Sequence, residues 1–339
     1  MDTLLPTNSR NIVLIGASAG GVESLQSMFS ELRSDLNASF FVVLHIPAHS
    51  PSKLEQILQA VTSMHVTFAH DRQLIMPNTV YVATPDRHLM VEGQYIRITR
   101  GPKECRVRPS IDVLFRSAAL AFGPRAIGVI LTGNLDDGTA GLWQVKDRKG
   151  LAFVQDPEEA MYRSMPDSAI EHVDVDCIGS IKTLAAEITK EIGSPLILSP
   201  EEQPRPGQLV ENLIAMEGNG MQAGVMELGK VSKFTCPECH GVLVQIEEGK
   251  LVRFRCHTGH AYSFKSLLSD VNEAIDTGLW DTIRAVEERI LLLRQFADDV
   301  EANGDLREAS RMRARADLAE QKYQPLRGLV LDEDFFSSD

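Results

Sequence analysis

The first half of the chain alternates short apolar runs with longer stretches in which apolar residues recur every three or four positions. The runs are rich in β-branched residues, typical of strands buried on both faces, and the longer stretches are typical of helices. This alternation predicts a doubly wound α/β fold, in which a mostly parallel sheet lies between two helical layers (α/β/α). Residues 81–99, with Gly93, are expected to include one antiparallel hairpin. The predicted strands are 11–15, 40–44, 79–83, 126–131 and 151–154, and the predicted helices are 22–32, 52–58, 111–121 and 138–149.

A change in composition follows the α/β pattern. Residues 193–207 contain four prolines with Ser, Glu and Gln between them, which is typical of a linker. Farther on, an apolar stripe at helical spacing begins at Phe264, and a second amphipathic stretch spans about 306–323. We therefore predict an α/β domain at 8–193, a linker at 194–230, a cysteine-rich module at 231–262 and a helical hairpin at 263–325.

Composition and charge narrow the class of protein. Of the 339 residues, 43% are hydrophobic and 24% charged, as in globular proteins with a full-sized core. The net charge is −13, and the chain beyond residue 200 carries the larger share, which argues against nucleic-acid binding. No apolar run is long enough to span a membrane, and residues 1–10 do not resemble a secretory signal, so we expect a cytoplasmic protein without membrane insertion.

The first predicted strand leads into a turn of small residues around Ser18. A strand–turn–helix of this kind leaves the serine hydroxyl exposed at a helix N-terminus, where free backbone N–H groups can stabilise an oxyanion. The alternative is a phosphate-binding turn, but the glycine spacing matches neither the dinucleotide nor the P-loop pattern. Ser18 is therefore a candidate nucleophile.

Two further candidates follow predicted strands. His45 ends the second strand, and in a parallel sheet it would lie at the same edge as Ser18, placed to act as a general base. Asp136 and Asp137 follow the strand at 126–131, where one carboxylate would orient the histidine and the other would cap the next helix. Each residue alone has an ordinary structural explanation. Together they predict a Ser-His-Asp triad.

These residues lie in motifs that resemble the catalytic domain of CheB-type chemotaxis methylesterases. The similarity covers about residues 8–193. It implies that Ser18 is the nucleophile, His45 the base and Asp137, rather than Asp136, the orienting carboxylate. The motifs are Gly16 to Gly21 (Gly-Ala-Ser-Ala-Gly-Gly), Leu44 to Pro47, Arg108 to Phe115 (Arg-Pro-Ser-Ile-Asp-Val-Leu-Phe), Leu131 to Gly133 with Asp137 and Gly138, and Met165 with Pro166.

The resemblance also implies an activity. Backbone N–H groups near Ala19 and Asn134 would donate to the oxyanion, and catalysis would need no cofactor. The family hydrolyses glutamate γ-methyl esters on the cytoplasmic helices of chemoreceptors, and some members also deamidate receptor glutamines. Methylated receptor helices, with other chemotaxis signalling proteins, are therefore the expected partners. The alternative is an idle α/β scaffold that acts as a signalling adaptor.

The sequence departs from the family pattern at two places. Ser18 comes eighteen residues from Met1, so we expect no receiver domain in the same chain to control the site. Asn134-Leu135-Asp136 stands where many members have Met-Gly-Asn, a difference that concerns the oxyanion loop.

The third region with recognisable chemistry is the cysteine-rich module. Cys236, Cys239, Cys256 and His260 have the spacing C-x₂-C-x₁₆-C-x₃-H, which predicts a zinc ribbon with a closed, structural site. His240 or His257 is an alternative fourth ligand. The odd number of cysteines in the chain, five, argues against a disulfide framework.

Overall fold

The protein forms two compact units, Met1–Ser266 and Leu267–Asp339, in a computed structural model that describes residues 7–196 and 203–332. Part of the predicted linker, residues 197–202, lies outside the described residues. Among the described helices, none combines the length and the apolar character that a membrane span requires.

The larger unit is built on a seven-stranded parallel sheet in the order β3-β4-β2-β1-β7-β8-β9. All five predicted strands are present, and two short edge strands, β3 and β9, join them. The predicted antiparallel hairpin is formed by β5 (His88–Glu92) and β6 (Tyr95–Thr99). The sheet strands are β1 (Ile12–Ala17), β2 (Ser39–Leu44), β3 (His65–Phe68), β4 (Thr79–Val82), β7 (Ala126–Ile130), β8 (Leu151–Gln155) and β9 (Cys177–Gly179).

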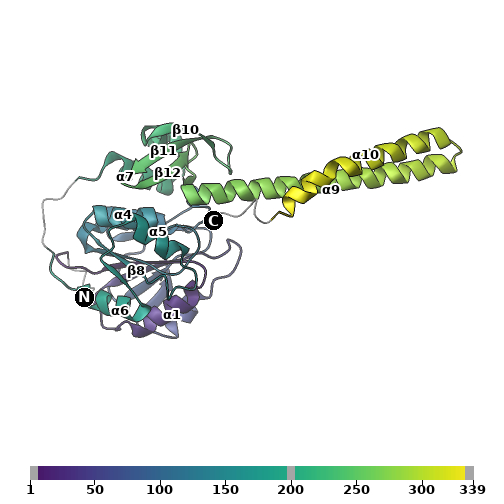
Figure 1. Ribbon diagram of the computed structural model, residues 1–339. Coiled ribbons are helices and arrows are strands. Elements are labelled where there is room, and N and C mark those ends of the chain that lie inside the picture. Colours follow the sequence, from purple (N-terminus) through teal and green to yellow (C-terminus); the bar gives the residue numbers. More distant parts are fainter. Residues whose placement is uncertain (1–6, 197–202, 333–339) are drawn as a thin grey trace. The chain divides into compact units, whose positions relative to one another are not determined.

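Helices cover both faces of this sheet (Figure 1). Along β1, Ile12 and Leu14 face one apolar core, and Val13 and Ile15 face the other, as the period of a strand requires. The predicted three-layer α/β/α fold is confirmed. One face carries α3 (Ile111–Phe122), α4 (Thr139–Asp147) and α5 (Ser164–His172), and the other carries α1 (Gly21–Glu31), α2 (Leu54–Gln59) and α6 (Ile181–Glu191).

The segment predicted as a linker contains helical structure. Helix α7 (Pro206–Glu217) begins with proline at its first position and ends at Gly218 in the left-handed region, and both are common helix boundaries. It packs on α3 and β6, and the short α8 (Gly220–Ala223) follows it. The boundary between the compact units therefore falls after Ser266 rather than in the proline-rich segment.

The cysteine-rich module is an antiparallel sheet in the order β10-β11-β12-β13, and it belongs to the larger unit. Leu243, Val244 and Phe254 are buried in it, while Val231 and Phe234 are exposed. We call this sheet and its two cysteine-bearing turns the ribbon. Its strands are β10 (Lys230–Thr235), β11 (Val242–Glu248), β12 (Leu251–Cys256) and β13 (Ala261–Ser263).

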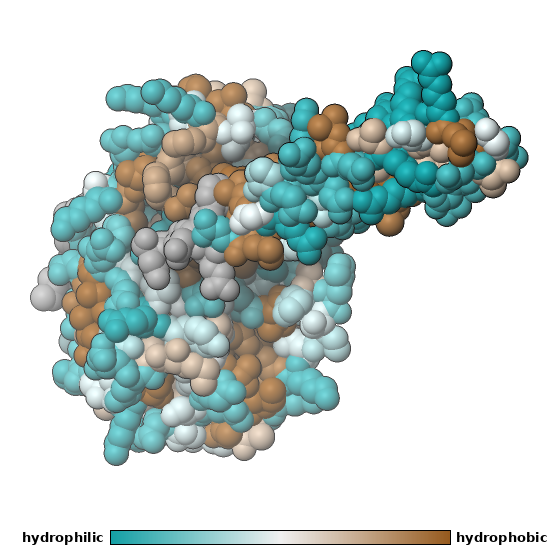
Figure 2. All heavy atoms as spheres, turned by 45° about the vertical axis from the view of Figure 1, so that its right-hand side comes forward, coloured by the Kyte–Doolittle hydropathy of each residue, from teal (hydrophilic) through white to brown (hydrophobic). Residues whose placement is uncertain are grey.

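The smaller unit is the predicted helical hairpin. Helix α9 (Phe264–Ala302) and helix α10 (Leu306–Val330) share an apolar seam that includes Ile283, Ile290 and Ala316. Arg294 of α9 forms an ion pair with Glu320 of α10, with 2.5 Å between the guanidinium nitrogen and the carboxylate oxygen. The hairpin surface is largely hydrophilic and is interrupted by apolar side chains (Figure 2). Helix α10 extends five residues beyond the predicted end of the hairpin at residue 325.

Candidate active site

The candidate residues follow three neighbouring strands. Strand β1 pairs in parallel with β2 on one side and with β7 on the other, so their carboxyl ends lie next to one another. Ser18 follows β1, His45 follows β2, and Asp137 lies in the turn between β7 and α4. The structure therefore brings together three residues that are up to 119 positions apart in the sequence.

The three side chains form a continuous hydrogen-bonded row. Nδ1 of His45 lies 3.1 Å from Oγ of Ser18, and Nε2 of His45 lies 2.8 Å from Oδ2 of Asp137. The carboxylate accepts a hydrogen bond from the N–H at Nε2, which leaves Nδ1 without a proton and able to accept the proton of the serine. The neighbouring carboxylate, Asp136, instead accepts a hydrogen bond from Ser263 at 2.7 Å.

The start of helix α3 holds the carboxylate of Asp137. Its Oδ1 accepts from the hydroxyl of Ser110 at 2.8 Å and from the backbone N–H of Asp112 at 3.2 Å. Its Oδ2 accepts from the backbone N–H of Ile111 at 2.7 Å. These donors belong to the helix N-terminus, where unpaired N–H groups favour a negative charge. Sequence reasoning gave these three residues no role, although the Arg-Pro-Ser-Ile-Asp motif contains them.

Asp112 of α3 binds the N-terminus of helix α4 in the same way. Its Oδ1 accepts from the backbone N–H groups of Gly138 at 3.0 Å and Gly141 at 2.6 Å. Asp137, which precedes α4, thus caps helix α3, and Asp112, which lies in α3, caps helix α4. Burial, followed by the charge of Asp137, raises the pKa of Asp112 well above its usual range.

The turn at the serine needs small residues. Gly20 has φ +71°, in the left-handed region, and helix α1 begins directly after it. A Cβ on Gly133 would meet Sδ of Met165 at 2.1 Å and Cβ of Ser18 at 2.8 Å. The loop after β7 therefore runs directly beside the serine. The two predicted oxyanion donors, Ala19 and Asn134, each follow one of these contacting residues in the chain.

A cavity of about 390 Å³ opens beside His45. Lys103, Arg106 and Arg108 line it together with Asp86, and Lys103 pairs with Glu238 at 2.7 Å. Arg108 donates to Asp86 at 2.9 Å. Burial acts to raise the pKa of Asp86, but the hydrogen bond and charge of Arg108 outweigh it and lower the pKa.

The predicted zinc ligands also converge. The Sγ atoms of Cys236, Cys239 and Cys256 and Nδ1 of His260 all lie within 4.8 Å of one another, so the cluster uses His260 rather than His240 or His257. Cys239 Sγ is 3.6 Å from Cys256 Sγ, which is 3.5 Å from the His260 nitrogen. Zinc bonds of about 2.3 Å to sulfur and about 2.0 Å to nitrogen place tetrahedral ligands roughly 3.5 to 3.8 Å apart. The donor set and its spacing fit zinc.

His88 binds the segment that leads into helix α3. It is fully buried, its Nε2 donates to the carbonyl of Pro102 at 2.9 Å, and its Nδ1 accepts from the backbone N–H of Ser110 at 3.3 Å. The accepting nitrogen requires a neutral ring, and burial lowers the pKa of His88.

The pH dependence of stability tests this arrangement. Because the folded pKa of His88 is lowered, the unfolded chain takes up the proton first, and stability is lost as the pH falls below the ordinary value of about 6.5. Compared with His88→Gln, the wild type should lose roughly 1 kcal/mol more unfolding free energy between about pH 6.5 and 5.5. Urea unfolding of both proteins measures the difference. Parallel pH curves would show that the buried ring does not resist protonation.

A family profile described as CheB methylesterase matches residues 13–188, slightly more than half of the chain. The catalytic domain of Thermotoga maritima CheB methylesterase has a similar structure, with a TM-score of 0.52 and 31% identity, over 54% of this chain and 98% of that one. The chain belongs to the CheB methylesterase family.

Relatives agree with this assignment. A Leptospira interrogans protein with the provisional name protein-glutamate methylesterase/protein-glutamine glutaminase is 37% identical over 51% of this chain and 90% of its own length. A Geobacter metallireducens protein-glutamate methylesterase/protein-glutamine glutaminase is 32% identical over 55% of this chain but only 53% of its own length. The residues that the family profile matches, 13–188, lie in the α/β domain.

Proposed function

We propose that this protein is a protein-glutamate methylesterase that hydrolyses glutamate γ-methyl esters on chemoreceptor helices. The observation that carries the proposal is the hydrogen-bonded row of Ser18, His45 and Asp137 in a chain of this family. Two relatives named for this activity, from Leptospira and Geobacter, support it.

In the proposed reaction, Ser18 is the nucleophile and His45 the general base. Oγ of Ser18 attacks the ester carbonyl carbon while Nδ1 of His45 takes the hydroxyl proton. Asp137 holds the imidazole and stabilises its cationic form. The tetrahedral intermediate expels methoxide, which receives the proton from His45 and leaves as methanol. Water, deprotonated by the same histidine, then attacks the acyl-enzyme and releases the free glutamate carboxylate.

Further groups are proposed to bind the oxyanion and the substrate. The backbone N–H groups of Ala19 and Asn134 would donate to the oxygen that becomes negative. Lys103, Arg106 and Arg108 line the cavity beside His45, where the receptor helix would bind. The same steps with ammonia as leaving group would deamidate a glutamine. Since receptor methylation concerns cytoplasmic helices, we place the reaction in the cytoplasm.

We also propose that the ribbon holds one structural zinc ion, bound by Cys236, Cys239, Cys256 and His260. Three thiolates and an imidazole in near-tetrahedral spacing support it. Zinc would close the two turns of the ribbon and take no part in ester hydrolysis. The proposed chemistry of the triad needs no cofactor.

Methanol release from methylated receptor separates the enzyme from its alternative, an idle signalling adaptor. Full-length protein is incubated with a receptor fragment methylated on glutamate, and methanol is measured over time. An unmethylated fragment serves as control. The proposal expects catalytic release of methanol from the methylated fragment only. Binding of the fragment without methanol release would support the adaptor instead.

A pair of neighbouring substitutions tests the choice of aspartate. Asp137→Asn should lower kcat by about 10⁴-fold, because the amide no longer stabilises the imidazolium or fixes its tautomer. Asp136→Asn should cost less than about tenfold, since the amide keeps an oxygen that accepts from Ser263. Steady-state methanol release measures both. A larger loss of kcat in Asp136→Asn than in Asp137→Asn would show that Asp136, and not Asp137, is the triad carboxylate.

A further inference from the structure

We infer that β13 of the ribbon is a positioning element of the catalytic centre, and that Ser263 is the residue through which it fixes the loop that carries Asp137. That this centre is catalytic rests on the proposed function. The contact between the ribbon and the centre rests on the hydrogen bonds and buried ion pairs described below. Nothing in the α/β pattern of the family region requires a ribbon at this place.

The direct contact is between Ser263 and Asp136. The hydroxyl of Ser263 donates to Oδ1 of Asp136 at 2.7 Å, and it accepts from the backbone N–H of Ser266 at 3.0 Å. The hydroxyl has a second acceptor within reach, Oγ of Ser266 at 3.0 Å, but the carboxylate of Asp136 is nearer and negatively charged and so takes the proton's hydrogen bond. Asp136 immediately precedes Asp137, so this bond fixes the backbone from which the triad carboxylate projects.

A second contact joins β13 to the wall of the active-site cavity. The backbone N–H of Cys105 donates to the carbonyl of Ala261 at 2.8 Å, and the N–H of Ala261 donates to the carbonyl of Lys103 at 3.2 Å. Residues 103–105 thus extend the edge of the ribbon sheet. The chain continues from there through Arg106 and Arg108 to Ser110, which binds Asp137.

Buried ion pairs hold the adjacent strand β12 against the same segment. Arg255 contacts Glu104 at 3.0 Å, and Glu104 contacts Arg116 of α3 at 2.7 Å, with all three side chains at most 2% exposed. Glu211 of α7 pairs with Arg255 at 2.9 Å and with Arg253 at 2.7 Å. Burial alone would raise the pKa of Glu104, but the charges of Arg116 and Arg255 lower it to about 2.

This ionic cluster sets the position of helix α3. Loss of one partner would leave a charge buried without compensation, which is strongly unfavourable, so these ion pairs are expected to stay formed. Arg116 lies between one and two turns after Ile111, whose N–H donates to Asp137. The ribbon therefore reaches the triad carboxylate from two sides, through α3 and through Asp136.

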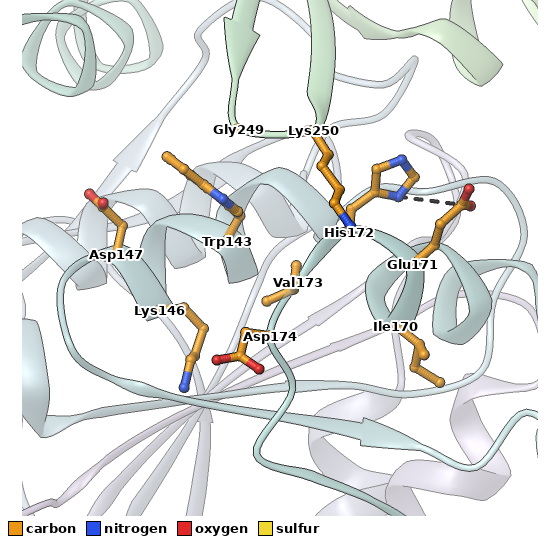
Figure 3. A pocket seen from close by; sticks show the side chains of 10 residues that line it. All are labelled: Trp143, Lys146, Asp147, Ile170, Glu171, His172, Val173, Asp174, Gly249 and Lys250. Atoms are coloured by element: carbon orange, nitrogen blue, oxygen red, sulfur yellow. Dashed lines mark ion pairs between the residues drawn. The ribbon is translucent and has the colours of Figure 1, made fainter.

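The ribbon also touches the α/β domain away from the triad. The turn between β11 and β12 approaches helix α4, where a Cβ on Gly249 would lie 3.3 Å from Nε1 of Trp143 (Figure 3). A hollow of about 580 Å³ lies between this turn and helices α4 and α5. This contact anchors the ribbon but bears on no group of the proposed triad. The contacts of β13 are different in kind, because each falls on a segment that holds Asp137 or lines the cavity.

Ser263→Ala in the full-length chain tests the inference. Loss of the hydroxyl should lower kcat about tenfold with little change in KM, because a misplaced carboxylate weakens the transition state rather than substrate binding. The acidic limb of the pH–rate profile should move to lower pH, since a displaced carboxylate stabilises the imidazolium less. Ser263→Thr, which keeps a hydroxyl, should restore most of the rate.

The matched control is Ser232→Ala on β10. This ribbon serine accepts from the backbone N–H of Phe234 at 3.1 Å, and it should leave kcat and the pH profile unchanged. An equal loss in Ser232→Ala, or an unchanged kcat and pH profile in Ser263→Ala, would overturn the inference. Thermal unfolding of all variants shows whether lost activity is merely lost folded protein.

A second readout does not depend on the reaction. Amide hydrogen exchange at Ile111 and Asp112, whose N–H groups donate to Asp137, should become about tenfold faster in Ser263→Ala and remain unchanged in Ser232→Ala. If the wild type released no methanol, the proposed function would fail while this exchange still tested the positioning. If methanol is released but exchange and kcat stay unchanged, only the positioning by β13 is wrong.

Discussion

Replacement of Ser18 by alanine is expected to abolish methanol release. Loss of a triad nucleophile lowers kcat by about 10⁴- to 10⁶-fold, because the remaining groups only orient the substrate and stabilise charge. The backbone of the turn should not change, since Ser18 uses its N–H to bond the carbonyl of Thr132 at 2.9 Å and its carbonyl to accept from Gly21. Steady-state kinetics with methylated receptor fragment measures the loss.

The control for this variant is its stability. Removal of one hydroxyl should change the free energy of unfolding by less than about 1 kcal/mol. Ser24→Ala on α1 provides a matched substitution, because its hydroxyl donates to the backbone carbonyl of Gly20 at 3.2 Å, and it should retain activity. If Ser18→Ala kept more than about a hundredth of the wild-type rate, another group would have to be the nucleophile.

Removal of zinc is expected to unfold the ribbon. Metal binding in such modules supplies on the order of 10 kcal/mol of folding free energy, and the ribbon core contains few large apolar side chains. Strong chelation, or Cys256→Ser, should remove exchange protection from β11 and β12 while the seven-stranded sheet stays protected. Because β13 carries Ser263, methanol release should fall as well.

Metal content and a second cysteine variant complete this experiment. Elemental analysis of protein purified without added metal should give one zinc per chain. Cys177→Ser, in the edge strand β9 and outside the cluster, should leave zinc content and ribbon protection unchanged. Folded protein with substoichiometric zinc, or a ribbon that stays protected after chelation, would contradict the metal assignment.

The sequence predicted the parts of the site that follow from strand ends. Buried apolar runs marked β1, β2 and β7, and parallel strands place their carboxyl ends together, so this reasoning grouped Ser18 and His45 with the pair Asp136 and Asp137. The choice of Asp137 came only from the resemblance to the family. The short edge strands β3 and β9 gave no such signal, because they have four and three residues and are only partly buried. Helix α7 was not predicted, because the prolines and glutamines around it are typical of a linker.

The attachment of the ribbon could not be predicted from sequence. Glu104, Arg116 and Arg255 are ordinary charged residues in local context, and up to 151 positions separate them. Their burial depends on tertiary ion pairs, in which Glu104 contacts both Arg116 of α3 and Arg255 of β12. From the sequence, the ribbon was expected to hold a structural zinc site, and nothing linked it to the triad. The contacts of Ala261 and Ser263 with the catalytic segments now predict a loss when the ribbon is absent.

The central claim is that this chain removes methyl groups from glutamate side chains of a receptor at Ser18. The most direct test is mass spectrometry of a receptor fragment carrying a known number of glutamate methyl esters, after incubation with wild type and with Ser18→Ala. We predict that wild type replaces each methyl group by hydrogen, at the modified glutamates only, and that Ser18→Ala leaves the fragment unchanged. An unchanged fragment after incubation with wild type, or equal demethylation by Ser18→Ala, would contradict the account.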